Sequence, residues 1–271
     1  MQYEPIKALI GRYIKGHPFL RKILYFLIDI LLLRAWHIRK ALCSIKERLP
    51  ENAAILDAGS GMGQYSWRLS RMRKGWSIKG VDINKNEISD CREFFESQRL
   101  SGRVSFETAD LTRLADHEAF NFIITVDVME HIEDDSLVFR NFFMALRNNG
   151  ILLISTPSDR GGSDAHDSDT ESFIDEHVRN GYGLEEITLK LRDAGFTVTE
   201  ARYTYGWPGS ISWKLTMKYP VTMLNKSWLF FIVLPFWYLV FFPVALLMNL
   251  LDVSLKHSTG TGLLITAEKQ N

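Results

Sequence analysis

The sequence predicts an α/β protein with a seven-stranded, mostly parallel, Rossmann-like sheet covered by helices on both faces. Two observations lead to this prediction. Apolar runs of strand length alternate with segments of helix length from residue 53 to residue 205, which is typical of parallel sheets buried on both sides. The glycine-rich stretch GSGMG (59–63) follows the first apolar run, and ligands of open α/β sheets bind where such strands end.

Each expected strand is an apolar run bounded by turn or polar residues. The seven runs are 53–58, 77–82, 104–109, 120–129, 150–156, 196–205 and 261–269, and the fifth follows a turn at Asn148-Asn149-Gly150. Helices of the sheet domain are expected at 64–72, 84–98, 136–146 and 183–194. Asn84 is a typical N-cap for the second of these helices. The long polar segment 158–182 is rich in histidine and acidic residues, and a loop of this length is typical of a substrate lid.

The chain divides into three parts: N-terminal helices in 1–50, a sheet domain made of 51–205 and 260–271, and a hydrophobic insertion at 206–259. In the first part, helices are expected at 5–15 and 19–49. This part contains ten Lys and Arg residues and three acidic residues. The stretch FLRKILYFLIDILLLRAW (19–36) mixes these charges with apolar residues, which predicts an amphipathic helix lying on a membrane surface or packing on a core.

The insertion contains 25 consecutive residues without a charge, 227–251, enough to span a bilayer. The strands on either side should belong to one sheet, so the chain must leave and return on the same side of any membrane. Pro235 and Pro243 are expected to break or kink a helix. We therefore expect a monotopic or re-entrant insertion with tryptophan and lysine side chains at the interface. The alternatives are an extra core against the N-terminal helices and burial in a dimer.

Composition limits the partners and the compartment. The 32 basic residues equal the 32 acidic residues in number, so the overall basic character typical of nucleic-acid binding is absent. Cys43 and Cys91 lack metal-type spacing and are expected to be reduced thiols. The first 16 residues do not match a signal peptide. These features favour the cytoplasmic face of a membrane, with the oligomeric state left open.

The three glycines of the loop, Gly59, Gly61 and Gly63, let the backbone approach a ligand while N–H groups of the following helix point at it. Asp82 ends the next strand, where an acidic residue can bind ribose hydroxyls. A dinucleotide is one candidate ligand, but the last glycine of its fingerprint would fall at Gln64 or Ser66. The acidic residue before the glycines, Asp57, suits a ligand with a cationic amino group.

Five motifs in order resemble the class I S-adenosylmethionine-dependent methyltransferases. They are ILDAGSGMG (55–63), VDIN (81–84), ADL (109–111), ITVDVMEHI (124–132) and LRNNGILLISTPS (146–158), and TGLLITAEK fits the last strand of the family. The resemblance implies S-adenosylmethionine as the cofactor. It implies that the glycine loop lies under the methionine portion and that Asp57 supports the amino end through this loop.

The same resemblance implies the roles of further residues. Asp82 would bind the ribose, Asp110 the adenine amino group, and Asp127 would lie near the methionine end. Ser60, Ile83 and Leu111 belong to the same motifs and are included among the cofactor-binding candidates. Tyr65 is expected either to cover the cofactor or to pack into the core.

The segment Asp127-Val128-Met129-Glu130-His131 also resembles the quinone-biosynthesis O-methyltransferases, whose E-x-x-E-H motif is linked to a divalent metal. Here the first acidic residue is Asp, and the same letters occur in the superfamily without a metal, so we assign no metal ligand. His131 at the end of the fourth strand is a candidate general base because of its pKa range. The alternative is a histidine that caps the following loop. His166 in the polar loop is a second candidate base, metal ligand or headgroup contact.

These features predict a membrane-associated methyltransferase acting on a lipophilic small molecule with an aromatic or hydroxyl head group. Oxygen is favoured over carbon as the acceptor. Amide and amino-group methylation is disfavoured because the N-P-P-Y or D-P-P-Y signature is absent. One alternative is a non-catalytic binding or scaffold protein with the same fold. The other is a nicotinamide-dependent oxidoreductase.

Overall fold

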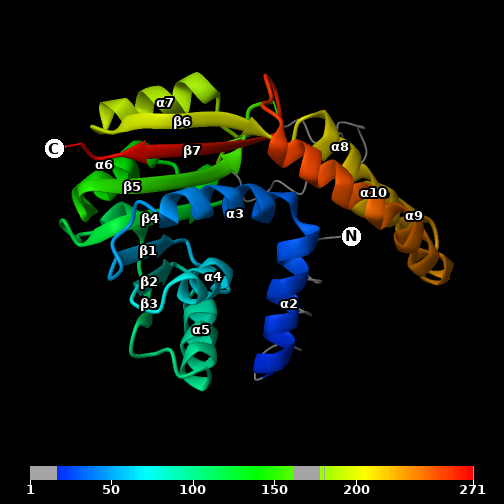
Figure 1. Ribbon diagram of the computed structural model, residues 1–271, viewed down its shortest axis with the longest axis horizontal. Helices are drawn as coiled ribbons and strands as arrows, with labels where there is room; N and C mark the ends of the chain where they lie inside the picture. Colours follow the sequence, from blue (N-terminus) through cyan, green and yellow to red (C-terminus); the bar gives the residue numbers. More distant parts are fainter. Residues whose placement is uncertain (1–16, 161–177, 180, 271) are drawn as a thin grey trace.

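The seven strands form one sheet with the order β3-β2-β1-β4-β5-β7-β6 (Figure 1). The computed structural model describes residues 17–160, 178–179 and 181–270. All neighbouring strands run parallel except β7, which is antiparallel to both β5 and β6. The fold class predicted from the sequence is therefore confirmed.

The elements of the sheet domain begin and end within a few residues of their predicted bounds. The strands are β1 (Ala54–Ala58), β2 (Ser77–Asp82), β3 (Val104–Thr108), β4 (Phe120–Val126), β5 (Leu146–Pro157), β6 (Thr197–Thr204) and β7 (Gly262–Glu268). The helices are α4 (Gln64–Met72), α5 (Lys85–Ser97), α6 (Asp135–Ala145) and α7 (Leu184–Asp193), with short 3-10 turns η1 (Leu111–Arg113) and η2 (Met129–His131).

Two strand ends differ from the prediction. β4 ends at Val126 because Asp127 has a left-handed backbone with φ of 50°. β5 begins at Leu146 and runs through the predicted turn. There Asn149 has φ of 61° and its N–H donates to the Lys269 carbonyl. The segment Asn148-Asn149-Gly150 is therefore an irregularity inside the strand.

The N-terminal region contains two described helices where one continuous helix over 19–49 was expected. α2 (Pro18–Leu31) and α3 (Leu33–Lys46) are separated by Leu32, whose extended backbone, with ψ of 114°, breaks the helix. The helix expected at 5–15 lies outside the described residues. Only α3 lies along the sheet, whereas α2 turns away beside α4 and α5 (Figure 1).

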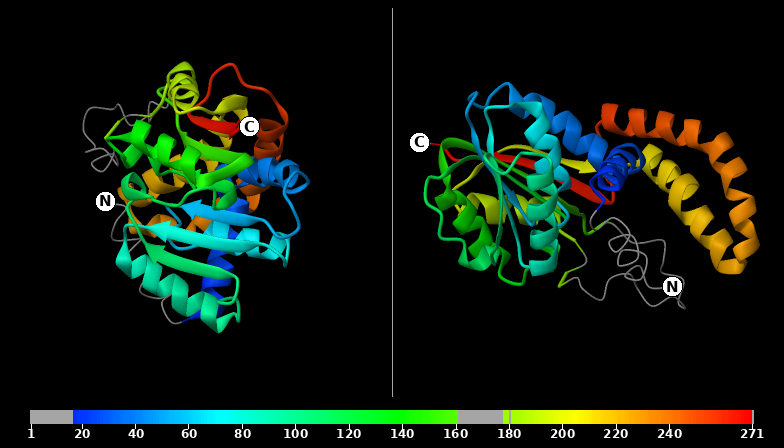
Figure 2. Two further views of the ribbon diagram at one scale, coloured as in Figure 1. Left: turned by 90° about the vertical axis from the view of Figure 1, so that its left-hand side faces the viewer. Right: turned by 90° about the horizontal axis from the view of Figure 1, so that it is seen from below.

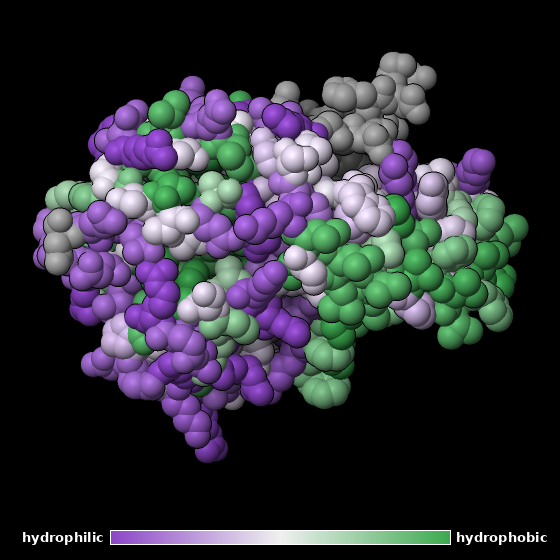
Figure 3. All heavy atoms as spheres, turned by 45° about the horizontal axis from the view of Figure 1, so that its top comes forward, coloured by the Kyte–Doolittle hydropathy of each residue, from purple (hydrophilic) through white to green (hydrophobic). Residues whose placement is uncertain are grey.

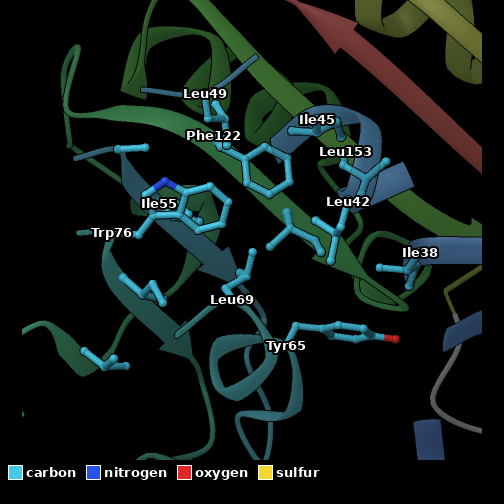
Figure 4. Packing of buried hydrophobic residues seen from close by; sticks show 14 of the residues in the cluster. Ile38, Leu42, Ile45, Leu49, Ile55, Tyr65, Leu69, Trp76, Phe122 and Leu153 are labelled. Atoms are coloured by element: carbon cyan, nitrogen blue, oxygen red, sulfur yellow. The ribbon is translucent and has the colours of Figure 1, made fainter. Parts of the chain in front are cut away.

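The core has a layer on each face of the sheet. One layer packs α3, α4 and α5 against the strands, and the other packs α6 and α7. Figure 4 shows how Ile38, Leu42 and Ile45 of α3 approach Phe122 and Leu153 of the sheet. These side chains are buried. The hydrophobic face of α3 therefore belongs to the sheet domain and is not available to a membrane.

Between β6 and β7 the chain forms a helical hairpin that extends away from the sheet (Figure 2). Its elements are α8 (Trp207–Trp213), a π-helix η3 (Lys214–Lys218), α9 (Tyr219–Lys226), a 3-10 turn η4 (Trp228–Ile232) and α10 (Leu234–Ser254). Because β6 and β7 are adjacent strands, the hairpin leaves and returns at the same edge. Of the two expected effects of Pro243, a break or a kink, the break does not occur: α10 continues through it and forgoes the hydrogen bond that a proline cannot donate.

Hydrogen bonds from two aromatic side chains to backbone carbonyls join the two arms of the hairpin. Trp237 Nε1 of α10 donates to the Leu215 carbonyl at 2.9 Å, and the Tyr238 hydroxyl donates to the Thr216 carbonyl at 2.7 Å. Both acceptors lie in the π-helix η3, where the regular helical pattern is interrupted. The irregular backbone is thus satisfied inside the hairpin.

A buried polar cluster fixes the root of the hairpin to the sheet domain. Asp252 of α10 accepts hydrogen bonds from His37 Nε2 at 2.7 Å and from the Gly209 N–H at 2.9 Å. Arg202 of β6 points a guanidinium nitrogen at His37 Nδ1 at 3.3 Å. Because Arg202 can only donate, His37 accepts at Nδ1 and carries its proton on Nε2. The imidazole is therefore neutral in this arrangement.

We predict that acidification weakens this attachment. Burial lowers the pKa of His37 below its ordinary value of 6.5, so the folded state resists protonation and the unfolded state does not. The free energy of unfolding should therefore fall as the pH drops below about 6.5. Urea unfolding of the wild type and of His37→Gln across this pH range isolates the contribution. Equal pH dependence in both proteins would contradict it.

Candidate active site

The loop between β1 and α4 requires glycine at three positions. Gly59, Gly61 and Gly63 have φ of 78°, 47° and 78°, in the left-handed region that favours glycine. A Cβ atom at Gly59 would lie 2.2 Å from Val128 Cγ2, so a side chain there would displace the segment after β4. The loop therefore presents backbone rather than side chains at the carboxyl ends of β1 and β4.

Asp57 supports this loop from behind. Its carboxylate is buried and accepts hydrogen bonds from the Ser66 N–H at 2.9 Å and the Ser66 hydroxyl at 2.6 Å. Burial raises the pKa of Asp57 to about 6, although the hydrogen bonds from Ser66 oppose the shift. The residue fixes the first turn of α4, which agrees with an action through the loop rather than by direct contact.

Asp82 lies beside the loop at the end of β2. One carboxylate oxygen accepts from the Gly61 N–H and the other from the Asn84 N–H, both at 2.8 Å. A carboxylate offers about four lone-pair sites, so two remain for the hydroxyls of a ribose. Ile83, the next residue, has a side chain that is 75% exposed, as expected where an aromatic ring of a ligand covers it.

Asp110 and Leu111 follow β3. Asp110 accepts from the Thr112 N–H at 2.9 Å and the Thr112 hydroxyl at 2.7 Å, and these bonds lower the pKa of its carboxyl group. The carboxylate thus caps η1 while remaining partly exposed. The Leu111 side chain is buried in the core, so Leu111 can reach a ligand only through its backbone.

Asp127 lies at the end of β4, and its partner is a residue that the motifs did not indicate. Arg34 of α3 forms an ion pair with the Asp127 carboxylate. The Tyr65 hydroxyl is buried close to the same guanidinium, and burial raises the pKa of this phenol. Arg34 escaped the sequence reasoning because it lies outside every motif and reaches the strand ends only through the packing of α3.

The residues present fit S-adenosylmethionine. The loop offers bare backbone, Asp82 retains acceptor sites, and Arg34 and Asp127 supply both charges at the methionine end. The Ser60 hydroxyl is buried without a hydrogen-bond partner among the described residues, whereas the Tyr65 hydroxyl interacts with the Arg34 guanidinium. Buried polar groups are normally paired, so a ligand that bonds to the Ser60 hydroxyl would satisfy it.

Of the two candidate catalytic histidines, the structure describes one. His131 lies exposed at the end of η2, and its N–H donates to the Val128 carbonyl at 3.0 Å. His166 lies outside the described residues. Glu130 is buried and accepts from the Thr156 hydroxyl at 3.0 Å, so Glu130 and His131 differ in exposure. Within the described ranges no cluster of three or more histidine, cysteine or acidic residues could hold a metal.

Comparison with known proteins identifies the family. A family model described as "Methyltransferase domain" matches residues 49–193, which is more than half of the chain. The chain belongs to the class I S-adenosylmethionine-dependent methyltransferases. The resemblance seen in the motifs is thereby confirmed, and S-adenosylmethionine is the cofactor of this domain.

The related proteins differ in their named substrates. The chain is 34% identical over 122 residues to methyltransferase GfsG of Streptomyces halstedii, covering 44% of this chain and 43% of that protein. It is 30% identical over 163 residues to phosphoethanolamine N-methyltransferase 1 of Arabidopsis thaliana, covering 56% and 30%. It is 27% identical over 106 residues to the ubiquinone biosynthesis O-methyltransferase of Pelagibacter ubique, covering 39% and 42%. The chain thus spans less than half the length of these relatives.

Solved structures agree on the fold. Phosphoethanolamine N-methyltransferase 2 of Haemonchus contortus, in complex with phosphomonomethylethanolamine and S-adenosylhomocysteine, has a TM-score of 0.63 at 18% identity, covering 100% of this chain and 58% of that one. The cyclase SpnF has a TM-score of 0.57 at 16% identity, covering 88% and 82%. Because these neighbours include a cyclase, likeness of fold leaves the reaction and the substrate open.

We predict that Asp82→Ala weakens S-adenosylhomocysteine binding about 100-fold, since two hydrogen bonds to a charged group would be lost. Asp82→Asn keeps one oxygen acceptor and should lose about tenfold. Calorimetric titration measures both affinities, and a thermal melt checks the fold. Unchanged affinity in a folded Asp82→Ala protein would remove the ribose assignment.

We also predict that Arg34→Gln weakens binding of the methionine end of the cofactor but not of its nucleoside end. Its guanidinium lies beside Asp127 at the methionine end and can also pair with the methionine carboxylate, so S-adenosylhomocysteine should bind at least about tenfold more weakly. 5′-Methylthioadenosine lacks that carboxylate, and its affinity should not change. Equal weakening of both ligands would show that Arg34 supports the site as a whole instead.

Proposed function

We propose that the protein transfers the methyl group of S-adenosylmethionine to a hydroxyl group of a lipophilic small molecule at a membrane surface. The proposal depends on the family and on one observation, the continuity between the cofactor site and the hairpin. The site lies at the cytoplasmic face in this proposal, with the protein bound peripherally or as a monotopic protein.

Arg34 connects the cofactor site to the root of the hairpin. Its side chain pairs with Asp127 at the methionine end, while its backbone N–H donates to the Tyr205 hydroxyl at 2.9 Å. Tyr205 lies between the end of β6 and the start of α8. A substrate that moved along the hairpin root would therefore arrive where the activated methyl group is held.

The surface of the hairpin supports membrane contact. In the described part of the chain, α10 is the one helix whose length and composition would suffice to cross a bilayer, and little of its apolar stretch is buried. Figure 3 shows a continuous hydrophobic surface over the hairpin. Its exposed apolar side chains include Trp207, Trp228, Phe231, Ile232, Phe236, Leu239, Val240 and Leu247. An exposed patch of this kind is typical of a surface that contacts a membrane or another protein.

The internal bonding of the hairpin fits the same environment. In a bilayer, irregular backbone is tolerated only where its polar groups are satisfied within the protein. Trp237 and Tyr238 provide this for the π-helix carbonyls. Three lysines of the insertion, Lys214, Lys218 and Lys226, would lie at the headgroup level.

The reaction needs alignment and removal of one proton. Bound S-adenosylmethionine supplies a methyl group activated by the sulfonium. The acceptor oxygen forms the new C–O bond as the C–S bond breaks. The electron pair of the C–S bond stays on sulfur. In this proposal His131 takes the hydroxyl proton, because it lies at the strand ends and histidine is the side chain that most often acts as a general base.

A nitrogen acceptor is the second candidate function. Several relatives are phosphoethanolamine N-methyltransferases, so the missing N-P-P-Y or D-P-P-Y signature does not exclude nitrogen. The apolar hairpin favours a lipophilic acceptor over a soluble amine. The family assignment argues against the nicotinamide alternative, and a measured methyl transfer would exclude the scaffold alternative.

We predict that Phe236→Asp with Leu239→Asp releases the protein from lipid vesicles. Both side chains are exposed on α10, and each acidic residue in hydrocarbon costs about 3 kcal/mol, so vesicle affinity should fall at least about tenfold. Transfer of labelled methyl from S-adenosylmethionine into a total lipid extract should fall with it. The affinity for S-adenosylhomocysteine should not change.

Leu189→Asp on α7 is the matched control, because this exposed leucine lies on a helix outside the hairpin. It should leave vesicle binding and lipid methylation unchanged. If the double variant still floats with vesicles, the hairpin is not the membrane contact. If the wild type binds S-adenosylhomocysteine but labels no lipid, the lipophilic acceptor is wrong.

A further inference from the structure

Helix α2 is arranged in the reverse of an ordinary surface helix. Arg21 and Tyr25 are buried, and Asp29 lies one further turn along the same face. The opposite face exposes apolar side chains, namely Phe19, Leu20, Ile23, Phe26, Leu27 and Leu31. A surface helix normally buries its apolar face and exposes its polar one. In α2 the Tyr25 ring packs into the core against Trp67 and Phe94, but the six apolar side chains named here remain exposed.

The polar face of α2 forms hydrogen bonds with the cofactor loop. The Arg21 guanidinium donates to the Met62 carbonyl at 2.5 Å and to the Asp90 carbonyl at 2.9 Å. The Tyr25 hydroxyl donates to the same Met62 carbonyl. Met62 lies between Gly61 and Gly63, so α2 fixes the backbone of the loop from the side opposite the sheet.

A second set of contacts joins α2 to α4. Asp29 accepts from Gln64 Nε2 at 3.1 Å and forms an ion pair with Arg68. Gln64 is the first residue of α4, whose N-terminal N–H groups face the ligand site. Any displacement of α2 would therefore release both the loop and the start of the helix behind it.

The apolar face of α2 has the character of a bilayer-binding surface. Its side chains include Phe19 and Phe26, which are 73% and 63% exposed. Lys22 lies on the same helix, and residues 1–50 carry ten basic residues against three acidic ones. An apolar helix face that carries a basic residue such as Lys22, in a basic stretch of sequence, suits the interface of an anionic membrane.

We infer that α2 docks on an anionic bilayer and thereby strengthens cofactor binding. The inference rests on the proposed function, since it requires both a cofactor in the loop and a membrane at the hairpin. Seating α2 on lipid holds Arg21 and Tyr25 against Met62, which keeps the loop in its binding conformation. By linkage, the cofactor must strengthen membrane binding by the same factor.

The test is titration of S-adenosylhomocysteine with and without vesicles of phosphatidylcholine and phosphatidylglycerol. The protein is diluted below the critical micelle concentration of its detergent. The dissociation constant should fall about tenfold at saturating vesicles, a typical coupling between two sites. In Phe26→Asn this gain should disappear while the value without vesicles stays the same, because Phe26 is exposed and touches neither the loop nor α4 by any described bond.

Leu189→Asn on α7 controls for surface polarity and should keep the gain. If the wild type floats with vesicles and binds S-adenosylhomocysteine equally in both conditions, the coupling is wrong while the proposed function stands. If S-adenosylhomocysteine binds in neither condition, the proposed function fails as well. If Phe26→Asn keeps the gain but changes the oligomeric state, a second copy of the chain covers α2 and the lipid assignment is overturned.

Discussion

The backbone of the loop 59–63 is the constraint on which the rest of the structure depends. Its three glycines are all left-handed, so the surface offered to the cofactor is set by the path of the chain. That path is fixed from three directions: by Asp57 through Ser66, by Asp82 through the Gly61 N–H, and by α2 through the Met62 carbonyl. The sheet supplies the first two contacts, and the N-terminal region supplies the third.

The hairpin follows from a different constraint. Because β6 and β7 are neighbours in one sheet, a long insertion between them must return to the edge from which it left. The buried cluster around Asp252 fixes that return to α3 and β6. Since α3 also carries Arg34, the hairpin and the methionine end of the site share one helix. The proposed membrane contact and the methionine end of the site are therefore connected through α3.

The sequence predicted those features that depend on local pattern. The strands, the N-cap at Asn84 and the strand-end acidic residues follow from periodicity and motif spacing, and the structure has Asn84 accepting from Asn86 and Glu87 as an N-cap should. The partner of Asp127 could not be predicted, because Arg34 reaches it only through tertiary packing. The orientation of α2 could not be predicted either. Its mixed pattern allowed either face inward, and hydrogen bonds to the loop decide in favour of the polar one.

The most direct test of the account is calorimetric titration of the detergent-purified protein with S-adenosylhomocysteine, with NAD as the control ligand. The account predicts micromolar binding of S-adenosylhomocysteine and no binding of NAD, because the loop, Asp82 and Arg34 together fit a nucleoside that carries an amino acid. Binding of NAD alone would contradict the cofactor site described here. Binding of neither ligand, in detergent or on vesicles, would contradict it equally.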